Sequence, residues 1–304
     1  MGVMKHLVSV SDASKKEFDE LLILAENIKK RPRDYHHAME HKTLVMLFEK
    51  KSTRTRLSFE IAMTQMGGHA IYFNPADTQF KKEDLKDTAK MFSCYADVLT
   101  GRVFSHDTLT EIAKHSSIPV INALSDIEHP TQAIADILTI KEHKGLKGVK
   151  AAFVGDGNNV CNSLILACAY AGVEIAVACP RGYEPDAEIV KKAKQAGGKV
   201  TITNDPAIAV SGADAVYTDV WVSMGQEEDS KKKMEAFKKY KVTKALMKLG
   251  NDAIFMHCLP AIRGSEVDAD VIDGPSSVVY PQAENKLYAQ KAAIVKLVNV
   301  PGGI

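Results

Sequence analysis

The sequence of 304 residues has few aromatic side chains, 7% in all, and a single tryptophan. It also lacks an excess of charge of either sign, because 39 lysines and arginines face 38 aspartates and glutamates. A surface without a general basic field is not suited to nucleic acid or an anionic membrane, so an anion site has to be built locally. The hydrophobic share of 45% is ordinary for a globular protein and excludes collagen-like and disordered chains.

Cysteines are few, and neither their number nor their spacing indicates metal or disulfide chemistry. The five of them form an odd number without a C-x-x-C pair, which argues against a disulfide framework and a zinc ribbon. Cys161 and Cys168 lie seven residues apart, but no histidine or second thiol pair joins them, so buried packing is the simpler interpretation. We therefore expect reduced thiols, no bound metal and no cofactor.

Long apolar runs are absent as well. The most apolar stretch, 164–180, is shorter than the ~20 residues that a membrane span needs and is interrupted by Gly172 and Glu174. Residues 1–6 lack the continuous apolar segment of a secretory signal. The sequence therefore predicts a cytoplasmic protein with neither a membrane nor a nucleic acid as partner.

Strand-like and helix-like runs alternate from end to end, as in proteins whose parallel sheets are covered by helices. Together with a length that suits two domains, this predicts an α/β protein of two doubly wound parallel-sheet domains joined by helices, with the active site in the cleft between them. The predicted strands are 43–48, 70–73, 97–99, 119–121, 149–154, 173–178, 200–203, 215–218 and 254–256.

Two helices are expected in the first half. Leu57, Ile61 and Ala62 share one face of a helix that Gly67 and Gly68 end. A second helix begins at Pro130 and continues with apolar residues at i, i+3 and i+4 spacing to about residue 145. We place the domain boundary at this helix, with domains at 1–140 and 141–283, and expect a C-terminal helix at about 284–304 to pack against the first.

A basic, hydroxyl-rich segment follows the first predicted strand, with the sequence S-T-R-T-R at 52–56 where a helix begins. The first N–H groups of a helix lack internal partners and carry the positive end of its dipole, so this junction suits a phosphate dianion. Hydroxyl groups add donors, and Arg54 adds a bidentate contact. A capped helix with a solvated basic turn is the structural alternative.

A glycine-containing loop, G-D-G-N-N at 155–159, follows another predicted strand. It half-matches a dinucleotide fingerprint, but the third glycine and the acidic ribose partner are missing, which argues against NAD. Three more strings stand near the ends of predicted strands: H-P-T-Q at 129–132, D-V-W-V-S-M-G at 219–225 and H-C-L-P at 257–260. Strand ends are where open α/β sheets place ligands.

Taken together, these strings resemble the aspartate/ornithine carbamoyltransferase family over essentially the whole chain. S-T-R-T-R and H-P-T-Q are similar to its carbamoyl phosphate motifs, whereas the D-x-x-x-S-M-G, H-C-L-P and G-D-G-N-N strings are similar to its ornithine branch rather than its aspartate branch. The resemblance implies that 1–140 binds carbamoyl phosphate and that 141–283 binds ornithine. It also implies a homotrimer, or a multiple of trimers, that works in arginine metabolism.

The resemblance carries site residues over one position at a time. The carbamoyl phosphate set is Ser52, Thr53, Arg54, Thr55, Gln79, Arg102, His129, Pro130, Thr131, Gln132, Cys258, Leu259 and Lys286, and the ornithine set is Asn159, Asp219, Ser223 and Met224. Catalytic roles are expected for Arg102, His129, Thr55, Asp219 and Cys258. Two positions depart from the family pattern: lysine stands at 286 where arginine is common, and the loop with Gln79 is a residue short, a loop that in the family reaches into a neighbouring subunit.

The implied reaction moves the carbamoyl group of carbamoyl phosphate to the δ-amine of L-ornithine, giving L-citrulline and phosphate without a covalent enzyme intermediate. Donors fixed around the carbonyl oxygen would stabilise the transition state. Alternatives stay open: putrescine or N-acetylornithine as the acceptor, Cys258 as an acylated nucleophile, or a non-catalytic protein that binds a phosphorylated metabolite.

Overall fold

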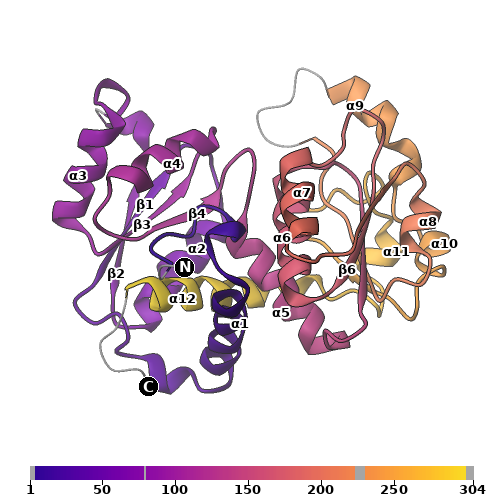
Figure 1. Cartoon of the computed structure of the whole chain (residues 1–304), viewed down its shortest axis with the longest axis horizontal. Coiled ribbons are helices and arrows are strands. Elements are labelled where there is room, and N and C mark those ends of the chain that lie inside the picture. The colour runs from indigo at the N-terminus through magenta and orange to yellow at the C-terminus, as the bar shows by residue number, and fades with distance from the viewer. Residues whose placement is uncertain (1–3, 79, 223–229, 299–304) are drawn as a thin grey trace. The chain divides into compact units, whose positions relative to one another are not determined.

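The computed structural model describes residues 4–78, 80–222 and 230–298. The chain forms two compact units, one of residues 1–138 with 286–304 and the other of residues 139–285 (Figure 1). The division falls inside two helices, α5 (Pro130–Lys144) and α12 (Val279–Val298), so each of them contributes residues to both units. The units are described one at a time.

Each unit contains one sheet, and every strand pair in both sheets is parallel. The first sheet has the order β2-β1-β3-β4 and the second has the order β7-β6-β5-β8-β9. The strands are β1 (Thr43–Phe48), β2 (His69–Phe73), β3 (Val98–Arg102), β4 (Val120–Leu124), β5 (Lys150–Val154), β6 (Glu174–Ala178), β7 (Val200–Thr203), β8 (Ala215–Tyr217) and β9 (Ile254–Met256).

Helices connect successive strands throughout. Besides α5 and α12 they are α1 (Lys15–Lys30), α2 (Arg54–Gln65), α3 (Leu85–Tyr95), α4 (His106–His115), α6 (Asn159–Ala171), α7 (Ala187–Gln195), α8 (Pro206–Val210), α9 (Ser230–Phe237), α10 (Lys244–Met247) and α11 (Ala269–Ile272). Short 3₁₀ turns are η1 (Val10–Asp12), η2 (Pro32–Tyr35), η3 (Pro75–Asp77), η4 (Phe80–Lys82) and η6 (Lys238–Tyr240). None of the helices in the described ranges is long and apolar enough to span a bilayer.

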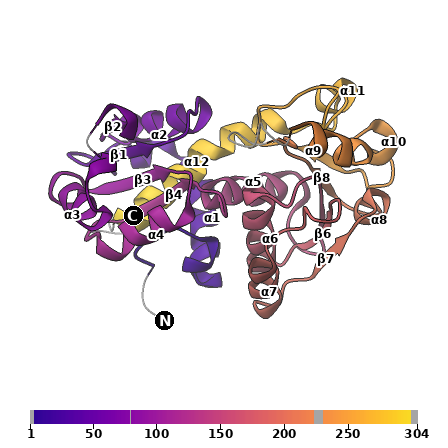
Figure 2. The same ribbon diagram turned by 90° about the horizontal axis from the view of Figure 1, so that it is seen from above.

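The first sheet is apolar because its central strands are buried over nearly their whole length. Val45 and Leu47 of β1 pack with Phe92 of α3 and with Leu109 and Ile112 of α4 in one cluster. Helices α3 and α4 therefore cover one face of this sheet (Figure 1). In the same unit α12 runs beside α1 in both views (Figures 1 and 2), where Lys296 donates to Glu20.

The second sheet has helices on both faces, which is the doubly wound arrangement. Alternate residues such as Val154 of β5 and Phe255 of β9 pack against α8, α9 and α11 in one cluster. Helix α6 is buried over ten consecutive residues and lies with α7 on the opposite face (Figure 1). This unit therefore has the three-layer core that the alternating sequence predicts.

The predicted α/β class with two parallel sheets is confirmed, and so are the predicted strands, three of them without any shift and the others with shifts of one to three residues at their ends. The face predicted for α2 is wrong in part: Ala62 is buried, but Leu57 and Ile61 are 50% and 41% exposed. The buried positions of α2 are instead Thr55, Phe59, Ala62 and Met63. Two apolar side chains are therefore left on the surface of the first unit, close in sequence to the predicted phosphate segment.

A glycine turn leads from α5 into β5 at the amino end of that strand. Gly145 and Gly148 have φ angles of 73° and 75°, in the left-handed region that favours glycine. A Cβ added at either position would meet no atom within 4 Å. The turn is therefore set by backbone conformation and not by close packing.

Candidate active site

The predicted phosphate segment lies at the carboxyl end of β1, where the chain turns into α2. Thr53 is the N-cap residue, and its side chain makes no capping hydrogen bond to described residues. The first amides of α2 are thus not occupied by the cap, and they carry the positive end of the helix dipole. Thr55 is buried, Ser52 is half-buried, and Thr53 and Arg54 are exposed. This end of the helix suits an anion.

Arg102 lies beside this segment because β1 and β3 are neighbours in the sheet. The register pairs Phe48 with Arg102, and the N–H of Glu49 donates to the Arg102 carbonyl at 2.9 Å. Arg102 is only 7% exposed. Burial and the charge of Arg102 lower the pKa of nearby Lys50. Cations are therefore concentrated at one edge of the sheet, which favours a phosphate dianion.

The H-P-T-Q segment lies at the same edge, since β4 is the next strand and pairs Leu124 with Arg102. His129, Pro130, Thr131 and Gln132 are all buried at the start of α5. The Nε2 of Gln132 donates to the Oδ1 of Asp136 at 2.9 Å. Burial, followed by the charges of Lys286 and Arg102, holds the pKa of His129 well below its usual value of 6.5. His129 is therefore a neutral imidazole at neutral pH.

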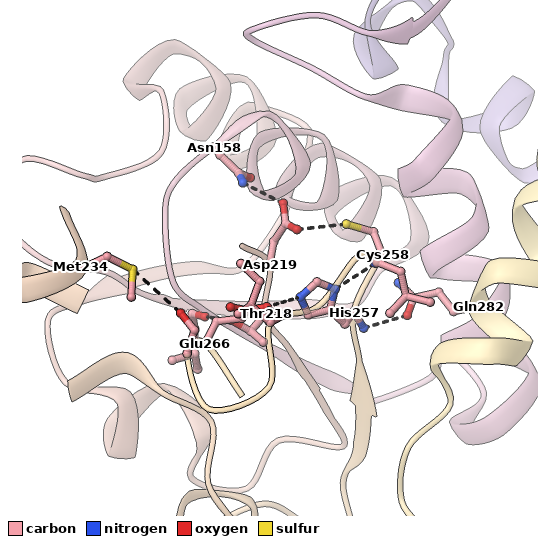
Figure 3. Close-up of polar contacts among 12 residues, drawn as sticks. Asn158, Thr218, Asp219, Met234, His257, Cys258, Glu266 and Gln282 are labelled. Atoms are coloured by element: carbon pink, nitrogen blue, oxygen red, sulfur yellow. Dashed lines mark hydrogen bonds and ion pairs between the residues drawn. The ribbon is translucent and has the colours of Figure 1, made fainter. Parts of the chain in front are cut away.

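In the second unit, the carboxyl ends of β5 and β8 bring two predicted segments together (Figure 3). The Nδ2 of Asn158 donates to the Oδ2 of Asp219 at 2.9 Å. The Oδ1 of Asn158 accepts from the N–H groups of Val160 and Cys161, so Asn158 caps α6. Because that oxygen is used by the helix, the amide nitrogen is directed to Asp219. Asn159 is the half-buried first residue of α6.

Cys258 approaches the same carboxylate from the end of β9, the neighbour of β8. Its Sγ donates to the Oδ1 of Asp219 at 3.2 Å (Figure 3). The backbone beyond it is unusual: Leu259 has a φ of 59°, and the Leu259–Pro260 bond is cis. Positive φ is uncommon for a branched residue and is maintained only where the surroundings determine it.

The side chains of His257 and Glu266 stabilise this turn through hydrogen bonds. The N–H of Leu259 donates to Nδ1 of His257 at 2.9 Å, so the ring proton is on Nε2, which lies 3.2 Å from Oε1 of Glu266. Both side chains are fully buried. Burial opposes ionisation of Glu266, but hydrogen bonds from His257 and the Ile262 N–H outweigh it and lower the pKa of that carboxyl. Figure 3 shows His257 directed away from Cys258 and towards Glu266.

The atoms that Asp219, His257 and Cys258 offer as metal ligands lie within 4.8 Å of one another. In the described part of the chain this is the only such group. Its members are already used in hydrogen bonds, Cys258 with Asp219 and His257 with Leu259 and Glu266. A metal ion there would have to replace these hydrogen bonds. The group is therefore better suited to bind a ligand through hydrogen bonds than to bind a metal.

The predicted site residues fall into two groups, one in each unit, and three of them are not described by the structure. The structure gathers Ser52, Thr53, Arg54, Thr55, Arg102, His129, Pro130, Thr131, Gln132 and Lys286 in the first unit, and Asn159, Asp219, Cys258 and Leu259 in the second. Gln79, Ser223 and Met224 lie outside the described residues. The contacts made by Asn158, Asp136 and Glu266 were missed. For Asn158 a signal existed, since an asparagine before an apolar run is a typical N-cap.

A family profile described as "Aspartate/ornithine carbamoyltransferase, carbamoyl-P binding domain" matches residues 5–142. A second, described as "Aspartate/ornithine carbamoyltransferase, Asp/Orn binding domain", matches residues 147–297. The two matches together cover nearly the whole chain.

Individual relatives are similar over nearly their full length. Ornithine carbamoyltransferase from Methanosarcina acetivorans is 51% identical over 298 residues, which cover 96% of this chain and 99% of that protein. The protein of the same name from Methanosarcina mazei is 50% identical over 301 residues, 96% of this chain and 99% of the relative. The solved ornithine carbamoyltransferase from Pyrococcus furiosus superimposes with a TM-score of 0.91 at 46% identity, covering 96% of each chain.

Proposed function

The chain belongs to the aspartate/ornithine carbamoyltransferase family, and on that premise we propose that it transfers the carbamoyl group of carbamoyl phosphate to the δ-amine of L-ornithine, giving L-citrulline and phosphate. The observation that carries this proposal is the pairing of Asp219 with Asn158 and Cys258 at the ends of three neighbouring strands. A carboxylate held in this way is suited to a cationic acceptor and not to a second anion.

The proposed carbamoyl phosphate domain comprises 1–140 with the C-terminal helix, and most of it lies in the first unit, 1–138 with 286–304. Its phosphate site consists of the amides and hydroxyls at the start of α2 with Arg54, and Gln79 belongs to the proposed set. Support comes from the shared edge of β1, β3 and β4, where Arg102, His129 and Lys286 add positive charge and donors. Attack places charge on the carbamoyl oxygen, and preorganised donors stabilise that charge.

His129, Arg102 and Thr55 are the proposed donors to that oxygen. A lysine ammonium only donates, so the approach of Lys286 makes Nε2 of His129 an acceptor and leaves the ring proton on Nδ1. A neutral imidazole with a fixed N–H stabilises an oxyanion without releasing its own proton. Gln132, fixed through Asp136, is proposed to contact the carbamoyl group.

Residues 141–283, which lie within the second unit, are the proposed ornithine domain. Its assigned residues are Asn159, Asp219, Ser223 and Met224, with Cys258 and Leu259 beside the reacting amine. An alkyl amine has a pKa near ~10, so the reactive neutral form has to be selected or generated. Asp219 and Cys258 are the nearest titratable candidates for accepting that proton, Cys258 only after its own thiol has been deprotonated. Comparing the pH profiles of Asp219→Asn and Cys258→Ala identifies which one.

Direct attack is favoured over an acylated cysteine. A cysteine nucleophile needs a neighbouring base to form its thiolate. Both ring nitrogens of His257 are used by Leu259 and Glu266, and the Cys258 thiol donates to a carboxylate, which favours the protonated form. These contacts support a route without a covalent enzyme intermediate.

The test is an acceptor panel at a fixed concentration of carbamoyl phosphate, with ornithine, putrescine, N-acetylornithine and aspartate and with product identified by mass spectrometry. Citrulline formed from ornithine with the highest kcat/KM supports the proposal. A faster reaction with another amine would identify that amine as the acceptor in place of ornithine. Saturable binding of carbamoyl phosphate without product from any acceptor would show a non-catalytic binding protein.

The assembly is proposed to be a homotrimer or a multiple of trimers. The exposed apolar side chains of Leu57, Ile61 and Ile71, from α2 and the edge strand β2, support an interface on the first unit. Light scattering should give a particle of three times the 33.2 kDa of one chain, or a multiple of that. A cytoplasmic location stays a prediction from the sequence.

A further inference from the structure

Helix α9 carries a buried lysine that no predicted motif includes. Lys233 is 5% exposed, whereas its neighbours Lys231 and Lys232 are exposed. Burying an ammonium group is unfavourable unless the group is paired and hydrogen-bonded. A lysine buried in this way is therefore expected to have a specific partner.

The partner is a carboxylate of the glycine loop, and two rings complete the surroundings. The Nζ of Lys233 donates to the Oδ2 of Asp156 at 2.6 Å. The same nitrogen lies 5.6 Å from the ring centroid of Tyr183 and 5.9 Å from that of Phe237. These rings meet edge to face at 4.9 Å. Ring faces attract a cation, so the ammonium group is held by one full charge and two aromatic quadrupoles.

This contact fixes the loop between β5 and α6 against the connection that follows β6. The N–H of Gly157 donates to the Tyr183 carbonyl at 2.9 Å. A Cβ at Gly157 would lie 2.2 Å from the backbone nitrogen of Pro185, so the two connections touch through their backbones. Lys233 contacts both of them, through Asp156 on one side and the Tyr183 ring on the other.

Two residues after Asp156, the same loop presents Asn158 to Asp219 and, through Asp219, to Cys258 (Figure 3). Asp156 and Asp219 are close enough for their charges to interact: burial, and to a smaller extent Asp219, raises the pKa of Asp156, which Lys233 opposes. Without Lys233, the buried carboxylate of Asp156 would lose this cationic partner while its charge still interacts with that of Asp219. The loop would then relax by protonation or displacement, and Asn158 would move with it.

We propose that Lys233 is a positioning residue for the acceptor amino acid: its contact with Asp156 holds the Gly155–Asn159 loop in the conformation that directs Asn158 to Asp219. This inference rests on the proposed function. Lys233 acts through Asp156 and Asn158 and does not itself touch the substrate. It therefore affects recognition of ornithine and leaves recognition of carbamoyl phosphate, which the first unit binds, unchanged.

The experiment is steady-state kinetics with both substrates for the full-length Lys233→Met, Lys233→Arg and Lys232→Met variants. Lys233→Met should raise the KM for ornithine about tenfold, which corresponds to ~1.4 kcal/mol, with little change in the KM for carbamoyl phosphate. Lys233→Arg keeps the charge and should restore most of the ornithine affinity. Lys232→Met changes an exposed lysine of the same helix and should match the wild type.

A second variant keeps the test valid if Lys233→Met folds poorly, because breaking one side of a buried pair leaves an uncompensated charge. Lys233→Met/Asp156→Asn removes both charges. If the pair acts as a unit, this double variant should show the same rise in the KM for ornithine as Lys233→Met alone or Asp156→Asn alone, and not the sum of the two effects.

The outcomes separate the inference from the proposed function. If the wild type forms no citrulline from ornithine, the proposed function fails. If it does so and folded Lys233→Met keeps the wild-type KM for ornithine, the inference is wrong. A parallel rise of both KM values, not restored by Lys233→Arg, would also overturn it, because that result describes a general structural role.

Discussion

The Nζ of Lys286 lies 3.4 Å from Nε2 of His129, and both side chains are buried. The two residues are 157 positions apart in sequence, and α12 brings the lysine to the start of α5. The contact sets the tautomer of His129 and adds to the burial that keeps its pKa low. Lys286 thus adds to the burial that keeps the neighbouring histidine neutral.

Replacing Lys286 by methionine should raise the pKa of His129 towards 6.5, because one of the two cations that disfavour imidazolium is removed. Histidine titration followed by NMR measures this directly. Lys286→Arg keeps the cation and serves as the control. An unchanged His129 titration in Lys286→Met would show that burial and Arg102 are sufficient.

Arg102→Ala should lower kcat by about a hundredfold or more, since the loss of one preorganised donor to a developing oxyanion typically costs ~3 kcal/mol. The melting temperature should change far less than the rate. Arg102→Lys keeps the charge without the planar guanidinium, so its kcat is expected to lie between those of the wild type and Arg102→Ala. An unaltered turnover number in Arg102→Ala would contradict the assignment.

Cys258→Ala should keep substantial activity and raise the KM for ornithine, because the thiol donates a hydrogen bond and no covalent step depends on it. Asp219→Asn should impair ornithine binding more strongly, since it removes the charge that faces the amine. Mass spectrometry of the wild type with carbamoyl phosphate alone should show the unmodified chain. Detection of a carbamoylated Cys258 would revive the nucleophilic alternative.

Glu266→Ala should destabilise the protein by about 1–3 kcal/mol, because it leaves the buried His257 ring and the Ile262 N–H without their acceptor. The turn at Leu259 should relax, so the KM for ornithine should rise as well. Glu266→Gln retains an acceptor oxygen and should be milder in both respects. Urea unfolding and kinetics on the same preparations check the two effects.

The stabilisation that Glu17 gives to the start of α1 is expected to be lost in acid. Hydrogen bonds from the Ser14 hydroxyl and from the N–H groups of Ser14 and Met4 lower the pKa of Glu17 to about 2. Since the folded pKa is below the unfolded value of 4.5, the stabilisation is complete above 4.5 and is lost as the pH falls towards 2. The difference in Tm between wild type and Glu17→Gln should therefore shrink over that window. Asp19→Asn, at an exposed position of the same helix, is the control.

Strand positions were the most predictable part of the fold, because buried parallel strands are continuous apolar runs. The strands at 200–203 and 254–256 match residue for residue. Thr100, Gly101 and Arg102 interrupt the apolar pattern, so the sequence predicts that this strand ends at Leu99. In the structure the strand continues to Arg102. Gly101 leaves room there for the Leu109 side chain of α4, a requirement that the strand's own sequence does not reveal.

The candidate site was predictable where a motif is contiguous and not where it depends on strand order. The segment 52–56 marks itself by composition and by its place before a helix. The contact of Cys258 with Asp219 exists because β8 and β9 are neighbours, and that of Lys286 with His129 because the C-terminal helix returns to the first unit. Spacings of 39 and 157 residues contain no local signal.

The turn at Gly145 and Gly148 opens into β5 at the amino end of that strand, whereas the residues assigned to chemistry follow the carboxyl ends. Parallel sheets thereby separate the loops that hold ligands from the turns at the opposite ends of the strands. Because a side chain added at Gly145 or Gly148 would meet no atom within 4 Å, we expect this turn to tolerate inserted residues. For the same reason it offers a point at which a reporter or affinity tag can interrupt the chain while catalysis continues.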